Sequence, residues 1–153
     1  MANKNDITKT RMKAGDPAAD IFERFLNKNG INYQNYGLNK HANITGKMPR
    51  FVRNTPDYIV KGKVVSLFEV KGFKDELWLK VNDVYEYKKW NNIMNLWYFF
   101  VLFEEGKHEY KIINHFTLMN LITTSEQKQH GDPNYYDDKW CYVIQWDSIR
   151  SVI

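Results

Sequence analysis

The hydrophobic pattern of the chain begins with a helix. Asp16 and Pro17 predict its start, because an aspartate side chain caps free backbone N–H groups and proline suits the first helical position. Apolar residues then recur at helical spacing until Asn29-Gly30, which predicts the end of the helix. The apolar positions of this helix are Ile21, Phe22, Phe25 and Leu26.

The next part of the chain alternates between strands and one long helix. Residues 31–36 predict a strand, and residues 57–60 and 64–71 predict the two arms of a hairpin. The second arm is apolar on both faces, as is typical of a strand that is covered on both sides. The following elements are a loop at 72–76, a helix at 79–94 and a buried aromatic strand at 96–103.

The remaining third of the sequence is richer in strands. Its predicted elements are a strand at 109–113, a short helix at 116–122, a polar segment at 125–139, a strand at 140–146 and a last short helix capped by Asp147. The whole order predicts an α/β fold with an αβββαβ core, in which helices flank a mixed central sheet. We expect a single domain over residues 1–153, with the core at about 16–103 and a strand-rich extension at 104–153.

Composition indicates a compartment and the charge of a partner. The 153 residues carry a formal net charge of +4, a mild excess that suits an anionic partner. The single cysteine, Cys141, cannot form an internal disulfide, which fits a reducing cytoplasm. The longest apolar runs fall short of the roughly 18 residues of a membrane span, so we expect no membrane contact.

Positive charge is concentrated just before the central hairpin. From Ile31 to Pro56 the chain has no aspartate or glutamate, and a long loop is expected at 37–55. Its basic residues include Lys40, Lys47, Arg50 and Arg53. We expect them to bind the phosphate backbone of DNA rather than its bases, although a solvated loop whose charges aid solubility would have the same composition.

Two carboxylates and a lysine meet on the hairpin if its turn has three residues. Glu69 and Lys71 lie two positions apart on a strand, so their side chains share one face. With a three-residue turn at 61–63, Asp57 would pair near Leu67 and point to that same face. A two-residue turn would break this parity unless a bulge intervened. A salt bridge at the exposed end of a strand is the alternative interpretation of Glu69 and Lys71.

This arrangement suits the hydrolysis of a phosphodiester. Mg²⁺ prefers oxygen ligands and keeps several waters, so two carboxylates and one backbone carbonyl are enough to hold it. A bound Mg²⁺ lowers the pKa of water and neutralises developing charge. A lysine beside that water can orient it, hold it as hydroxide or stabilise the phosphorane.

The spacing of these residues resembles a known signature. Pro56-Asp57, eleven further residues and then Glu69-Val70-Lys71 resemble the PD-(D/E)XK nuclease superfamily, which has the restriction-endonuclease-like fold. The segment Phe22-Glu23-Arg24 is similar to the helix-borne glutamate of archaeal Holliday-junction resolvases. The segment Lys71-Gly72-Phe73, with a lysine-bearing helix after it, resembles phage-type members, which would place the chain in a host cytoplasm. The resemblance covers about residues 16–103.

The resemblance implies a role for each matching residue. Asp57, Glu69 and the backbone carbonyl of Val70 would bind Mg²⁺, with Mn²⁺ as a substitute, and Lys71 would serve the attacking water. Glu23 would complete the metal shell directly or through a water, unless it is only a surface glutamate of its helix. Lys80, expected on the helix at 79–94, would be either a further basic residue of the site or a solvated lysine.

The sequence therefore predicts a metal-dependent DNA endonuclease. Branched or junction DNA is the first expected substrate, and a homodimer is expected because cutting two strands symmetrically calls for two active sites. A site-specific homing or restriction-type endonuclease is one alternative, and a non-catalytic DNA-binding protein on the same fold is another. Nothing in the sequence separates DNA from RNA, or an endonuclease from an exonuclease.

Overall fold

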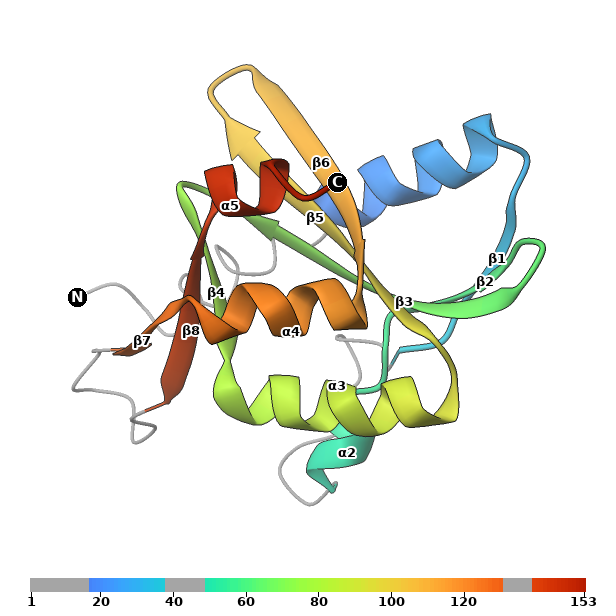
Figure 1. Ribbon diagram of the computed structural model, residues 1–153. Coiled ribbons are helices and arrows are strands. Elements are labelled where there is room, and N and C mark those ends of the chain that lie inside the picture. Colours follow the sequence, from blue (N-terminus) through green and yellow to red (C-terminus); the bar gives the residue numbers. More distant parts are fainter. Residues whose placement is uncertain (1–16, 38–48, 131–138) are drawn as a thin grey trace, which may run out of the picture.

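A mixed sheet lies at the centre of the fold, with its described strands in the order β1-β2-β3-β5-β6. The computed structural model describes residues 17–37, 49–130 and 139–153. β3 and β5 run parallel, and each other neighbouring pair is antiparallel. The strands are β1 (Asn32–Asn35), β2 (Tyr58–Lys61), β3 (Val65–Phe73), β5 (Leu96–Glu104) and β6 (Lys107–Asn114) (Figure 1).

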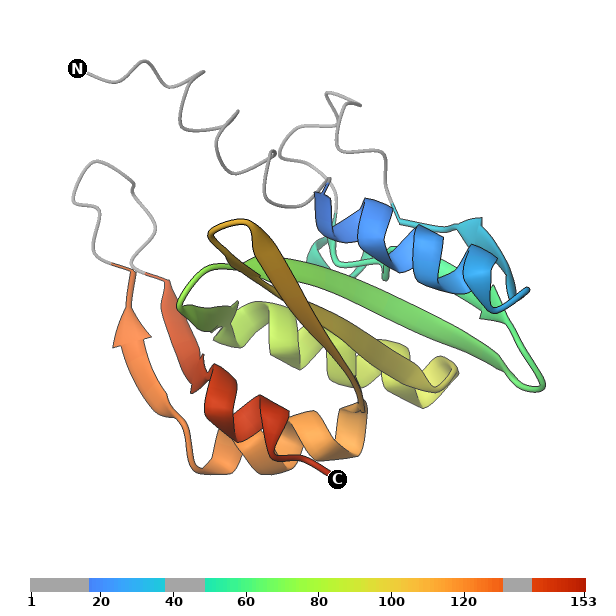
Figure 2. The ribbon, with the colours of Figure 1, turned by 90° about the horizontal axis from the view of Figure 1, so that it is seen from above.

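Helices cover both faces of this sheet (Figure 2). The N-terminal helix, residues 17–28, lies on one face, while α3 (Val81–Ile93) and α4 (His115–Thr123) lie on the other. β5 contributes to both apolar layers, because Phe99 packs toward the N-terminal helix and Phe100 toward α3. The aromatic run expected to form a buried strand does so, and an α/β fold with a mixed central sheet flanked by helices is confirmed.

The N-terminal helix ends where the sequence predicts. Gly30 has a φ of +65°, and its N–H donates to the carbonyl of Asn27. The N–H of Ile31 donates to the carbonyl of Leu26, which completes a Schellman ending. The start expected at Asp16 lies outside the described residues. The fully buried stripe of this helix consists of Ala18, Phe22 and Leu26.

A second sheet, in the order β4-β8-β7, corrects two expectations. Its strands are β4 (Glu76–Lys80), β7 (Glu126–Gln129) and β8 (Trp140–Gln145). Residues 79 and 80 belong to β4 rather than to the following helix, because Leu77 and Leu79 are buried between exposed neighbours with the alternation of a strand. β7 is exposed at every position, so its sequence carries no hydrophobic signal and its pairing with β8 defines it.

Three short helices also differ from the sequence-based expectation. α2 (Arg50–Arg53) forms within the segment expected to be a loop. α4 begins at His115, where the side chain of Asn114 caps it. α5 (Trp146–Arg150) begins two residues earlier than expected and has Gln145 at its N-cap position, so Asp147 lies in its first turn and is not its cap.

The part of the chain after residue 103 is built into the same core. β6 pairs along β5 in the central sheet, and β8 pairs along β4. Leu118, Trp146 and Ile149 pack in one cluster with side chains of β3, α3 and β5. Among the described residues, no helix has the length and apolarity needed to cross a membrane.

Replacing Phe22 with alanine should strongly destabilise the fold. Its side chain is fully buried, and its ring lies 5.0 Å from that of Tyr58, 5.1 Å from that of Phe68 and 4.8 Å from that of Phe99. The cavity left behind should lower the free energy of unfolding by about 3–5 kcal/mol in denaturant titrations. Phe116→Ala, at a phenylalanine that is 73% exposed, is the matched control and should change it by no more than about 0.5 kcal/mol. Equal effects of the two substitutions would contradict this account of the core.

Candidate active site

The register of the β2–β3 hairpin brings Asp57 next to Glu69. Lys61 pairs with Val65, so the connection has three residues, 62–64, one position later than expected. Because the connection still has three residues, the side chain of Asp57 lies on the same face of the hairpin as Glu69 and Lys71, as expected. The register therefore continues from Tyr58 and Phe68 to place Asp57 opposite Glu69 rather than opposite Leu67. The N–H of Val70 donates to Oδ2 of Asp57 over 2.9 Å, which holds the carboxylate against β3.

Gly37 fixes the backbone of Asp57 from the other side. The N–H groups of Tyr36 and Gly37 both donate to the carbonyl of Asp57. A Cβ atom at Gly37 would lie 3.1 Å from the Cα of Asp57 and 3.2 Å from the carbonyl oxygen of Pro56. Both of those atoms belong to the backbone, so a side chain at position 37 would displace Asp57.

Glu69 is a buried carboxylate with one satisfied oxygen. Its Oε1 accepts a hydrogen bond from the hydroxyl of Tyr87 over 3.0 Å and lies 3.1 Å from Nζ of Lys71. Its Oε2 is buried and has no hydrogen-bond partner. A buried carboxylate oxygen without a donor or a cation is costly, so this side of Glu69 is suited to a positively charged ligand.

The pKa of Glu69 is raised by its surroundings. Burial and the negative charge of Asp57 together raise the pKa of Glu69 to about 7, against the opposing effects of Lys71 and Tyr87. A divalent cation bound between the two carboxylates would offset the effect of Asp57 on Glu69 and favour the ionised form of Glu69.

Lys71 is a cation at neutral pH. The oxygen of Tyr87, together with the carboxylates of Glu69 and Asp57, raises the pKa of Lys71 well above its ordinary value against the effect of burial. About a third of its side chain is exposed, so the ammonium group is accessible to a ligand from solvent. In this state Lys71 can donate hydrogen bonds to a water or an anionic oxygen, and it cannot act as a base.

Glu23 lies beside Tyr58 rather than against Glu69. The pKa of Tyr58 is raised by burial, then by the charges of Glu23 and Asp57 and by the hydrogen-bonding effect of the Glu23 side chain. In the described part of the chain, no three acidic, histidine or cysteine side chains lie close enough together to hold a metal ion. A role for Glu23 at a metal therefore stays a prediction.

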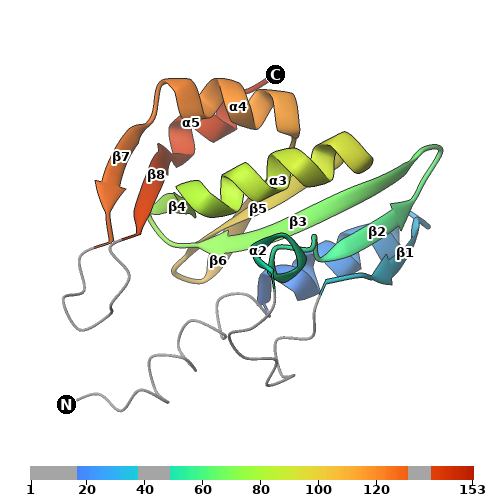
Figure 3. The ribbon, with the colours of Figure 1, turned by 90° about the horizontal axis from the view of Figure 1, so that it is seen from below.

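The basic residues expected to bind DNA are only partly described. Lys40 and Lys47 lie outside the described residues. Arg50 and Arg53 lie on α2, which is located beside α3 (Figure 3). Lys80 is the last residue of β4 and precedes the first turn of α3, and its pKa is lowered by burial and, to a smaller extent, by the charges of Lys139 and Lys71. Arg50, Arg53 and Lys80 line one hollow, although Lys80 was expected on a helix.

Sequence reasoning did not identify Gly37 or Tyr87 as parts of the site. Tyr87 lies on α3, eighteen residues from Glu69, and only the packing of that helix on the sheet brings its hydroxyl to the carboxylate. Its ring packs against that of Tyr98, whose hydroxyl lies 2.9 Å from Nδ1 of the buried His115. Aromatic residues in a helix are more often core residues, and their sequence spacing carries no sign of these hydrogen bonds.

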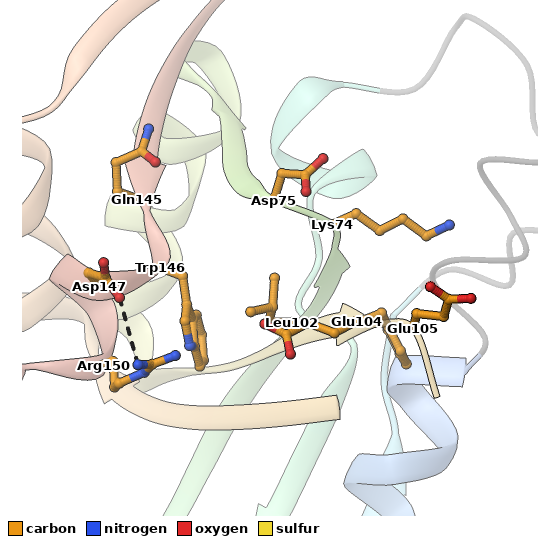
Figure 4. A pocket seen from close by; sticks show the side chains of 10 residues that line it. Lys74, Asp75, Leu102, Glu104, Glu105, Gln145, Trp146, Asp147 and Arg150 are labelled. Carbon is orange, nitrogen blue, oxygen red and sulfur yellow. Dashed lines mark ion pairs between the residues drawn. The ribbon is translucent and has the colours of Figure 1, made fainter. Parts of the chain in front are cut away.

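Another hollow, of about 680 Å³, does not include the candidate site (Figure 4). It lies where β3 and β5 end, and Asp75, Glu104, Glu105 and Asp147 contribute carboxylates to it. Arg150 faces Asp147 there at 3.7 Å. Its prevailing negative charge does not suit a nucleic acid.

Comparison with known proteins supports the fold. No protein-family model and no curated protein sequence matches the chain. The structure is similar to the Holliday junction resolvase Hjc of Archaeoglobus fulgidus, with a TM-score of 0.52 and 11% identity over 89% of this chain and 92% of that one. A nuclease from a fusellovirus gives a TM-score of 0.46 and 12% identity over 93% of this chain and 85% of that one. The likeness to the resolvase confirms the restriction-endonuclease-like fold that the sequence predicts.

The raised pKa of Glu69 should make the metal-free fold less stable as pH rises. Between about pH 4.5 and pH 7, Glu69 ionises in the unfolded chain but stays protonated in the folded one. The folded state then binds more protons, so the free energy of unfolding falls over this window, by an amount on the order of 3 kcal/mol. Glu69→Gln should remove this part of the fall, as measured by denaturant titrations in EDTA from pH 4 to pH 8. Glu104→Gln, at the exposed end of β5, is the control and should follow the original chain. Parallel profiles for the original chain and Glu69→Gln would show that Glu69 titrates normally.

Proposed function

We propose that this chain is a magnesium-dependent deoxyribonuclease that hydrolyses phosphodiester bonds, with Asp57, Glu69 and Lys71 at its centre. The observation that carries the proposal is the placement of Glu69: it is buried opposite Asp57, contacts Lys71 through one oxygen and leaves the other oxygen without a partner. The fold that it shares with a Holliday junction resolvase supports the same conclusion.

The residues present fit a Mg²⁺ ion. Asp57 and Glu69 would hold it together with the backbone carbonyl of Val70 and with waters, since Mg²⁺ commonly keeps several waters. The bound ion would lower the pKa of a coordinated water and neutralise charge on the phosphate. Mn²⁺ has similar ligand preferences and should replace it.

The protein's own residues would orient the reaction. The bond from the N–H of Val70 fixes one oxygen of Asp57, and Tyr87 fixes one oxygen of Glu69, so neither carboxylate must reorganise on binding. The charged Lys71 would donate a hydrogen bond to the attacking water or to the oxygen that gains charge. Glu23 would act from the far side, through a water near Tyr58.

Branched or junction DNA is the substrate that we propose first. The structural likeness to a Holliday junction resolvase supports this choice, and so does the basic hollow near Lys71. A homodimer would supply the two active sites that symmetric cutting of a junction requires. A panel of junction, flap, linear and supercoiled DNA with Mg²⁺ separates this substrate from the site-specific alternative, for which only one sequence would be cut.

Asp57→Asn and Glu69→Gln should each abolish cleavage while leaving the fold intact. Each change keeps the shape of the side chain but removes a charge that would hold the metal, so the cleavage rate should fall by roughly a hundredfold or more. Initial rates on the best substrate of the panel, together with thermal melting, measure both effects. Glu104→Gln is the matched control and should cut normally. A folded Asp57→Asn protein that retains the original rate would exclude this assignment of the site.

Metal binding should be detectable without any cleavage. Mg²⁺ or Mn²⁺ should raise the melting temperature of the original chain, because an ion that binds only the folded state stabilises it, and should have little effect on Asp57→Asn.

Cleavage should disappear in EDTA. Ca²⁺ should support DNA binding without cutting, since it tolerates looser geometry and acidifies water less. Full activity in excess EDTA would rule out the metal-dependent mechanism.

A further inference from the structure

The hollow lined by Arg50, Arg53 and Lys80 has a volume of about 290 Å³ and lies between α2, the start of α3 and β8. Its volume is near the lower end of the range for sites that bind small molecules, ~300–1,000 Å³. A hollow of this size has room for one nucleotide but not for a base pair. The side chains that characterise it are Arg50, Arg53, Lys80, Asp83, Lys139 and Trp140.

Positive charge dominates this hollow. Four of those side chains are cationic and one is acidic, and among the described residues no carboxylate forms an ion pair with Arg50, Arg53 or Lys80. The pKa of Lys80 is lowered by burial and by the charges of Lys139 and Lys71, although Asp83 opposes the shift. A bound anion would offset the repulsion among these cationic side chains, and arginine binds phosphate well through paired hydrogen bonds.

Trp140 contributes an exposed aromatic surface beside these cations. It is 51% exposed, whereas Trp90 and Trp146 are 7% and 6% exposed. The indole N–H groups of those two buried residues donate to the protein, and their rings pack in the core. A large exposed ring next to several cations is an arrangement that stacks a nucleic-acid base while the phosphate is held nearby.

The walls of the hollow are held in place by packing. The ring of Phe51, on α2, stacks on that of Trp90 with 4.3 Å between centroids and 7° between planes. The indole N–H of Trp90 also donates to the carbonyl of Phe51 over 3.0 Å. On the other side, Lys80 pairs with Cys141 in the β4–β8 ladder, next to Trp140. The backbone segments that carry the cations and the ring are therefore held in place before any ligand binds.

We propose that this hollow binds one unpaired nucleotide of a DNA strand, with its phosphate at Arg50, Arg53 and Lys80 and its base stacked on Trp140. The inference deepens the proposed function and rests on it, because Lys80, which lines the hollow, is close enough to Lys71 for their charges to interact. A nucleotide bound in the hollow would then lie near the bond that is cut. It implies that the substrate has at least one nucleotide that is open or easily unpaired beside the cleavage point, as at a fork or a junction.

Binding measured in EDTA tests this inference separately from cleavage. The probes are fluorescently labelled DNA of equal length, one a blunt duplex and one a fork with unpaired arms. Trp140→Ala should lower affinity for the fork by roughly 5- to 150-fold and leave affinity for the duplex almost unchanged, since stacking on an aromatic ring contributes to this extent for each base. Trp140→Phe should restore much of the loss. Trp78→Ala, at a tryptophan of the same sheet that is 37% exposed, is the matched control and should bind both probes normally.

A spectroscopic signal gives a second measurement. A 2-aminopurine base at the first unpaired position of the fork should lose fluorescence when it stacks on Trp140, and Trp140→Ala should abolish this quenching. Unchanged fork affinity in Trp140→Ala, or an equal loss on fork and duplex, would overturn the inference even if the protein cuts DNA. Fork binding that depends on Trp140 in a protein that never cuts DNA would instead support the nucleotide site and defeat the proposed nuclease.

Discussion

Backbone pairing between β2 and β3 determines where the charged groups of the candidate site lie. The three-residue connection puts Asp57 opposite Glu69 and directs Glu69 and Lys71 to the face covered by α3. A slip of one residue would turn Glu69 toward the N-terminal helix, into the layer formed by Phe22 and Val101. A carboxylate there would lie in a mainly apolar layer, so the hydrophobic pattern of β3 and the position of the acid favour the same register.

α3 connects the separate parts of the site. Tyr87 on this helix fixes Glu69, and Trp90, one turn later, holds α2 by stacking on Phe51. Lys80 stands immediately before its first turn. The helix contacts strands of both sheets, yet several of its buried side chains, including Tyr87 and Trp90, make polar contacts. A shift of α3 would therefore move the carboxylate, the arginines and Lys80 together.

The sequence was most informative where the signal is local. The aromatic run of β5, the ending at Gly30 and the two arms of the hairpin follow from periodicity and turn chemistry, and the structure confirms them. β4 and β7 were missed because partners far along the chain define them, and β7 has no buried position. The α/β class could thus be predicted, while the second sheet could not.

Prediction of the site had the same limit. Asp57, Glu69 and Lys71 stand out because charges are unusual on an apolar hairpin, and the structure places them together. Gly37 does not stand out, since its close approach to Asp57 depends on how β1 ends against the hairpin. The partner of Glu23 was also unforeseen, because Tyr58 points to the face opposite Glu69 and has the spacing of a core residue.

The pairing of β4 with β8 has a consequence for how the chain acquires this site. Glu76 and Gln145, joined by a hydrogen bond across these strands, are 69 residues apart, so this contact closes one of the long loops of the fold. Contacts that close long loops form late and slow the folding of small domains. During synthesis the hairpin with Asp57 and Glu69 can pair as soon as it emerges, whereas Lys80 and Trp140 meet only when the chain is almost complete. The two carboxylates can thus meet through local pairing, whereas the hollow is complete only once β8 has joined β4.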